Sequence, residues 1–433
     1  MGYIKTIFWL GVTLFCIIKI NEKKSRMILL CAIYYFVNVI NDIFLGSVLE
    51  LANCFGISYQ AADFMILTAL GSLVLDIIKK ARIRRQYENL FLAIIFLLFF
   101  KGVIGGILKF GASSEVIGDF RTIGIFIIYI IWFARFFDLD FLKKKITLID
   151  NIMICLSIIV VVVWIGDLVF GIRFLYSQYS GTLSDGGSSL RIVQSYNVMG
   201  FLFYSLYLLQ KDIFTYGRIS FKTIYFWGIT ILFQHRSVWL AAACGLVVMI
   251  VQLIIKKRVN KKIIIQFMGG VALVVILLTI SSGALIENIN HSWQLFLNIL
   301  SGEDVANTTA ATRQMVWKAA IEDLTGLEKC IGQVFGAGYA RSIGWETSPH
   351  SGYVRLFCRF GYVGSIAMIA IIVMIIRKNK SKIPLVIEFI VCILGFMYSY
   401  DFGLLCGCII GATISIVNQG DYGNTICRTE NYY

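Results

Sequence analysis

The sequence is poor in charged residues, prolines and histidines. Only 15% of its 433 residues are Asp, Glu, Lys or Arg, and it has 2 prolines and 3 histidines, whereas 58% of its residues are hydrophobic. So few charges exclude an ordinary soluble domain. Between the hydrophobic runs we find no nucleotide-binding loop, no metal-ligand spacing and no serine-nucleophile elbow. Any chemistry in these connections therefore proceeds without ATP and calls for a pre-activated substrate.

The hydrophobic residues form runs of about 17 to 25 residues, the length that a helix needs to cross roughly 30 Å of hydrocarbon. These runs are too long and too uniform for barrel strands. We therefore predict an all-α integral membrane protein with 12 or 13 transmembrane helices, depending on whether the first run spans. The candidate spans are residues 3–20, 27–45, 61–78, 90–108, 120–137, 147–169, 192–209, 222–234, 237–255, 263–281, 351–376, 384–400 and 402–417.

The net charge of +14 lies mainly in short lysine-rich connections such as KKRVNKK and RKNKSK. Alternate connections are basic, and by the positive-inside rule these are cytoplasmic, which predicts a lipid bilayer as partner and no nucleic acid. The predicted order is transmembrane helices over residues 1–281, an extracytoplasmic loop over 282–350, transmembrane helices over 351–417 and a cytoplasmic tail over 418–433. Within the loop, apolar residues at helical spacing predict an amphipathic helix over 312–324.

The stretch from Gly336 to Gly364 concentrates polar and backbone-shaping residues, including Pro349 and His350. Arg355 and Arg359 follow inside an apolar run, where charges are costly unless they face a wet, functional cavity. With Ser351 they recur every four residues and should share one helix face. The alternative interpretation is a loop entering a membrane helix, with glycines marking turns.

Positive charge on the predicted outer side is carried mainly by arginine. Topology alone does not require arginine there, and its planar fork of donors suits bidentate binding of phosphate or carboxylate. These outer and boundary arginines are Arg121, Arg173, Arg191, Arg236, Arg313, Arg341, Arg355 and Arg359.

Four outer stretches follow one another in a familiar order. They are RIVQSYN from Arg191 to Asn197, the turn QHRS containing His235 and Arg236, RQMVW from Arg313, and GAGY from Gly336 followed by His350-Ser351, nine residues and Gly361-x-x-Gly364. Together they resemble the O-antigen ligase and Wzy-type O-antigen polymerase superfamily of bacterial membrane glycan polymerases and ligases. The resemblance covers roughly residues 190–365.

The resemblance implies a metal-independent glycosyltransferase without a cofactor, which takes an undecaprenyl-diphosphate-linked oligosaccharide on the extracytoplasmic side of the bacterial inner membrane. A chain-length regulator is a further candidate partner. The implied catalytic residues are Arg236 and Arg313, which hold the diphosphate, and His350, which helps to activate the acceptor hydroxyl. The implied substrate-binding residues are Arg191, Asn197, His235, Arg341, Arg355 and Arg359.

Other interpretations stay open at this point. His350 can instead bond its own loop, and Arg236 can reach lipid headgroups from a helix end. A polymerase of O-antigen, capsule or exopolysaccharide repeat units is the favoured function, and a ligase delivering glycan to a lipid or protein is the first alternative. A transporter or flippase of a lipid-linked anion is the second, although we see neither the paired broken helices nor the internal repeats typical of transporters.

Overall fold

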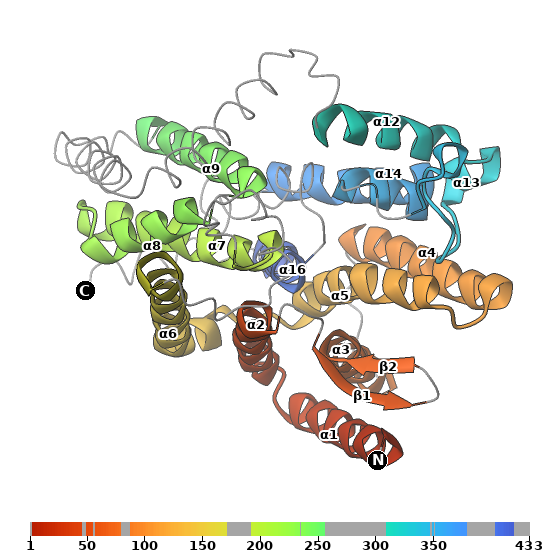
Figure 1. Ribbon diagram of the computed structural model, residues 1–433, viewed down its shortest axis with the longest axis horizontal. Coiled ribbons are helices and arrows are strands. Elements are labelled where there is room, and N and C mark those ends of the chain that lie inside the picture. Colours follow the sequence, from red (N-terminus) through yellow and green to blue (C-terminus); the bar gives the residue numbers. More distant parts are fainter. Residues whose placement is uncertain are drawn as a thin grey trace.

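Helices make up most of the protein (Figure 1). The computed structural model describes residues 2–45, 49–54, 57–78, 87–170, 192–233, 235–255, 309–346, 349, 351–378 and 403–419. Helices follow from the apolar sequence, because in lipid every backbone donor and acceptor must be satisfied within the segment.

Within the described residues, seven helices are long and apolar enough to cross a membrane, which confirms an all-α, multi-pass membrane protein. They are α1 (Gly2–Glu22), α2 (Arg26–Phe44), α3 (Ala61–Ile78), α4 (Tyr87–Phe110), α5 (Ser114–Phe136), α6 (Leu139–Phe170) and α14 (Gly352–Lys378). Further helices at predicted spans are α7 (Ser195–Lys211), α8 (Phe221–Leu232), α9 (Arg236–Ile255) and α16 (Leu404–Gln419). The predicted spans 263–281 and 384–400 lie outside the described residues.

The connection between α2 and α3 contains a small antiparallel hairpin, which the sequence analysis does not anticipate. Its strands are β1 (Glu50–Cys54) and β2 (Ile57–Gln60), with Cys54 opposite Ile57. The hairpin lies beside α3 in Figure 1, and the Tyr59 hydroxyl is 2.8 Å from Thr13 Oγ1 of α1. This contact ties the hairpin to the first helix.

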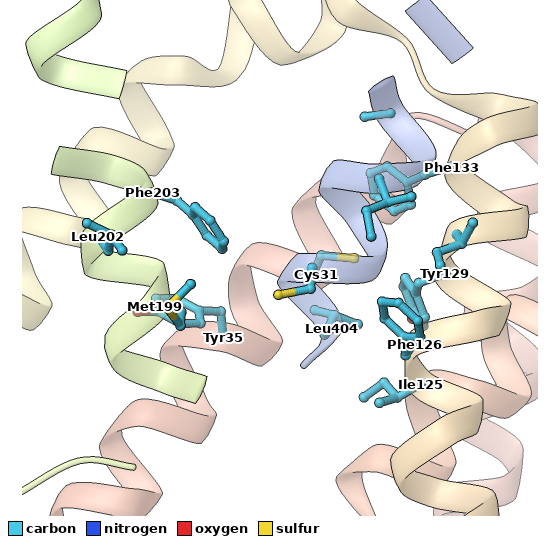
Figure 2. Close-up of a cluster of buried hydrophobic side chains, with 14 of the residues drawn as sticks. Cys31, Tyr35, Ile125, Phe126, Tyr129, Phe133, Met199, Leu202, Phe203 and Leu404 are labelled. Atoms are coloured by element: carbon cyan, nitrogen blue, oxygen red, sulfur yellow. The ribbon is translucent and has the colours of Figure 1, made fainter. Parts of the chain in front are cut away.

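Helix α16 packs in the centre of the bundle. In Figure 2 its Leu404 lies among side chains of α2, α5 and α7. Two glycines four residues apart let it approach α5 closely: a Cβ on Gly407 would lie 2.7 Å from the carbonyl oxygen of Phe126, and one on Gly411 would lie 2.5 Å from that of Ile130. Such small-residue stripes are a common means of close helix packing in membranes.

The two helices α12 (Thr309–Glu322) and α13 (Gly326–Ile331) pack against the first part of α14. Helix α12 overlaps the predicted amphipathic helix and lies alongside α14 in Figure 1. Its buried residues Val316 and Ala320 share a small core with Tyr339 and with Cys358 of α14, while Lys318 faces outward. Of the two placements that an amphipathic helix allows, on lipid or on the bundle, α12 packs on the bundle.

Helix α14 is interrupted at Gly361, whose φ of 60° and ψ of −161° are not helical. This backbone region is essentially open to glycine alone. A Cβ at Gly361 would lie 2.5 Å from the carbonyl group of Cys330, at the end of α13. Helix α14 is therefore broken at this position, which the apolar pattern of the sequence does not indicate.

Candidate functional site

Ser351, Arg355 and Arg359 share one face of α14, and all three are buried. Their position inside an apolar run predicts that the two arginines face a wet cavity. In the structure Arg359 is only 1% exposed, and its Nη2 lies 2.6 Å from Oδ2 of Asp119 on α5. A buried carboxylate therefore compensates this charge.

Asp119 accepts hydrogen bonds from three groups and forms an ion pair with Arg359. Its Oδ2 accepts from the backbone N–H of Gly336 at 2.9 Å, and its Oδ1 accepts from the Tyr339 hydroxyl at 3.1 Å and from Nη2 of Arg355 at 3.4 Å. Nη2 of Arg359 lies 2.6 Å from Oδ2, so four groups share the two oxygens of this carboxylate. One side chain of α5 thus joins α14 to the chain around residues 336–339.

Residues 332–339, here called the inserted segment, run between α4, α5 and α14. Phe335 is fully buried, and its N–H donates to the carbonyl of Gly102 on α4 at 3.0 Å. Glycines make room for this approach, since a Cβ on Gly102 would lie 2.6 Å from the Phe335 ring. The ammonium of Lys101 donates to the carbonyl oxygens of Ile331, at 3.2 Å, and Gly332. Part of the predicted outer loop therefore packs inside the bundle.

The network around Arg359 has more donors than acceptors. Nη1 of Arg359 donates to Oε1 of Gln333 at 2.8 Å, and Nη2 also donates to the carbonyl of Ala337 at 2.6 Å. Within the described part of the chain, Arg359 Nε and Gln333 Nε2 are buried without a hydrogen-bond partner. Unmade buried hydrogen bonds are costly, so acceptors are limiting here.

Tyr339 lies between the two arginines. The guanidinium carbon of Arg359 is 4.1 Å from the centre of its ring, and Nε of Arg355 donates to its hydroxyl at 3.1 Å. Burial raises the pKa of Tyr339 to about 12, and the charge of Arg359 offsets only part of that rise. The phenol therefore stays protonated at neutral pH and can donate to Asp119.

Helix α12 brings Arg313 toward the chain that precedes α14. Nε1 of Trp317 donates to the carbonyl of Pro349 at 2.5 Å. Arg313 is four residues before Trp317, so it lies one turn away on the same side of α12. His350 lies outside the described residues, but Pro349 precedes it directly. Arg313 is partly buried, and the helix that carries it contacts the residue before the predicted base.

Arg341 lies at the outer edge of this assembly. Its side chain is 42% exposed, and Nη2 donates to the carbonyl of Asp323 at 3.0 Å. Nη2 also lies 3.9 Å from Glu328 Oε2, near the limit for an ion pair. Arg341 therefore fastens the α12–α13 connection, and its assignment to substrate binding stays a prediction.

A second polar group surrounds Asn197 at the start of α7. Its Nδ2 donates to Asp42 Oδ2 at 3.1 Å, and its Oδ1 accepts from Asn38 at 3.0 Å, both on α2. Nε2 of His235 is 2.8 Å from the carbonyl oxygen of Val193. Asn197 and His235 therefore hold the entry to α7 as well as being predicted substrate ligands.

Besides His350, two of the predicted site residues cannot be located. Arg191 lies outside the described part of the chain, and so does the side chain of Arg236, although Arg236 begins α9. The predicted residues thus fall into two groups held by different helices. One contains Asn197 and His235, and the other contains Arg313, Arg341, Arg355 and Arg359.

Three charged residues of these networks are not among the predicted site residues: Asp119, Lys101 and Asp42. Lys101 and Asp42 are the only charged residues in the runs 90–108 and 27–45, and an ionisable residue inside a span is a reason to suspect function. Asp119 gives a weaker signal, because it precedes the predicted span 120–137 and counts as part of a connection.

No protein-family model, curated protein or solved structure matches this chain. The chain is therefore placed in the class of multi-pass membrane proteins by its apolar helices.

Proposed function

We propose that this protein is a membrane glycosyltransferase that polymerises undecaprenyl-diphosphate-linked oligosaccharide units on the outer face of the bacterial cytoplasmic membrane. The proposal starts from the resemblance of residues 190–365 to the polymerase and ligase superfamily. The structural observation that supports it best is the hydrogen bond from Trp317 to Pro349. It brings α12, which carries Arg313, against the residue before His350.

In the proposed reaction, a hydroxyl of one unit attacks the anomeric carbon of another. The bond between that carbon and the diphosphate oxygen breaks, and undecaprenyl diphosphate leaves. His350 takes the proton of the hydroxyl, while Arg313 and Arg236 stabilise the negative charge that develops on the diphosphate. Arginines take the place of a metal ion, so the reaction is expected to need no divalent cation.

Arg355 and Arg359 differ in how readily their guanidinium groups can reach a substrate. Arg359 can reach a substrate only after leaving Asp119, Gln333 and the carbonyl of Ala337, because all these groups hold its guanidinium. Arg355 is also buried, at 7% exposure. We therefore expect Arg313 and Arg236 to carry the diphosphate.

A transporter of a lipid-linked anion is the second candidate, and the break in α14 favours it. Interrupted helices often line transport sites, and this one carries two arginines before the break. Transporters usually pair such helices in repeated halves. Among the described long apolar helices we find one such interruption, at Gly361 of α14.

The test is turnover by purified protein in lipid nanodiscs with a lipid-linked repeat unit. A polymerase gives a ladder of chain lengths, a ligase gives a single product on an added acceptor, and a transporter gives neither. The ladder should persist in EDTA and disappear in His350→Ala, which should still bind the donor. Absence of products with every acceptor would refute a glycosyltransferase.

A further inference from the structure

We propose that Asp119 is a positioning residue, which fixes the inserted segment and both arginines of α14 relative to the chain before His350. The functional part of this inference rests on the proposed function. The structural part does not, since it concerns which side chain holds residues 332–339 in place.

The first step is that Asp119 of α5 contacts both the inserted segment and α14. Its oxygens accept hydrogen bonds from Gly336 and Tyr339 of the inserted segment, and Oδ2 forms an ion pair with Arg359 of α14. Asp119 itself is 5% exposed and lies near the start of α5. A shift of this side chain would therefore move the inserted segment and α14 together.

The second step is that the other acceptors of Arg359 cannot replace the carboxylate of Asp119. Gln333 and the carbonyl of Ala337 are neutral acceptors for Arg359, and two buried donors nearby already have no partner within the described residues. Asparagine at position 119 would offer one acceptor oxygen in place of two and would turn two donor hydrogens toward guanidinium groups. The network would lose acceptors where acceptors are limiting.

The third step connects the network to the proposed site. Two close backbone contacts join the inserted segment to α14: Gln333 N–H donates to the carbonyl of Cys358 at 2.7 Å, and a Cβ on Gly332 would lie 2.1 Å from the carbonyl of Arg359. The Arg355 N–H, six residues before the break in α14, donates to the carbonyl of Ser351 at 3.0 Å. Ser351 directly precedes α14, and position 350 directly precedes Ser351. Asp119 can therefore set the orientation of the helix that follows the predicted base.

Asp63→Asn is a matched control for Asp119→Asn. Asp63 of α3 is also buried. Its Oδ2 lies 2.7 Å from Nη2 of Arg121, which is on α5, the helix that also carries Asp119. Its other partners are at β2, including the N–H of Gln60 at 2.8 Å. The two substitutions therefore remove the same charge near the same helix end but release different segments.

The experiment is hydrogen exchange by mass spectrometry in nanodiscs, combined with turnover. Asp119→Asn should speed exchange in peptides covering residues 332–346 by about tenfold or more, because opening of a locally held segment sets its exchange rate. Asp63→Asn should speed exchange around residues 57–63 and leave 332–346 unchanged. Turnover should fall about tenfold or more in Asp119→Asn, and less than threefold in Asp63→Asn.

Unchanged exchange in residues 332–346 would overturn the proposal, and so would faster exchange with normal turnover, since the role would then be structural only. If Asp119→Asn does not fold, Asp119→Asn with Arg359→Gln removes the uncompensated charge, and the same exchange comparison applies. Wild-type protein without any turnover would refute the proposed function, whereas the exchange data would still decide whether Asp119 holds the segment.

Discussion

At the scale of single residues, the arginines of the apolar helices form ion pairs with carboxylates of neighbouring helices. The pairs are Arg359 with Asp119, Arg121 with Asp63, and Arg135 with Asp76, at 2.6 to 2.7 Å. Each pair has one member on α5. The pairs therefore fix the position of α5 relative to its neighbouring helices near both of its ends. Pairs of this kind add specificity more than net stability, because desolvation offsets much of their attraction. A charge inside a span is thus not by itself evidence of a wet cavity.

Arg236→Lys tests whether the proposed site requires the arginine fork. Lysine keeps the charge but cannot make two parallel hydrogen bonds to a diphosphate. Losing one or two charge-assisted bonds should raise the barrier by about 2 to 4 kcal/mol, a rate loss of about 30-fold to 1,000-fold. The measurement is turnover at matched protein levels.

Lys318→Ala is the control for that substitution. Its side chain is 77% exposed, and its ion pair with Glu322 is 3.9 Å long. Solvated charges contribute little, so turnover should stay within about threefold of wild type. Full activity of Arg236→Lys would instead mean that another residue, Arg313 or Arg355, holds the diphosphate.

At the scale of elements, the break in α14 is what allows α13 to reach the bundle. Gly361 adopts a positive φ of 60° and lies against Cys330, while Gly332 lies against the backbone of Arg359. Both contacts need the absence of a side chain, because any Cβ would overlap backbone atoms. The glycines thus fix where the outer helices join the membrane-spanning ones.

Gly361→Ala should destabilise the protein, since alanine must adopt a left-handed backbone conformation and displace Cys330. The strain alone should cost about 1 to 3 kcal/mol. Gly118→Ala is the control, because Gly118 lies in α5 with nothing within 4 Å of the added Cβ. It should be neutral or slightly stabilising. Thermal unfolding in nanodiscs measures both, and equal melting temperatures would contradict the assigned contact.

At the scale of the whole molecule, the distribution of lysine predicts the orientation in the membrane. The lysine-rich start of α6 is predicted to be cytoplasmic, and α13 is predicted to lie outside. Cys330 on α13 is an exposed free thiol and so offers a natural probe.

Cys330, kept as the single cysteine, should react with a membrane-impermeant maleimide in intact spheroplasts. Lys145→Cys in a background without other cysteines should react only after permeabilisation, because Lys145 is exposed on the basic side. The reverse pattern would invert the topology and remove the basis for an outer active site.

The positions of the helices could be read from the sequence because the signal is local. A run of apolar residues must form a helix in lipid whatever its neighbours are, and α3 coincides with the predicted span 61–78. The amphipathic character of α12 is likewise contained in its own residues. The hairpin and the break in α14 were missed, since each depends on backbone conformations that apolar runs do not reveal.

The sequence by itself determined the class of protein, the approximate spans and the shared face of Ser351, Arg355 and Arg359. Only the tertiary structure decided what that face meets. Asp119 is distant in the chain from Arg359, and no pattern in a single sequence says which carboxylate a buried arginine will find. Pairing of buried charges is set by how helices pack, because only close approach repays the loss of hydration.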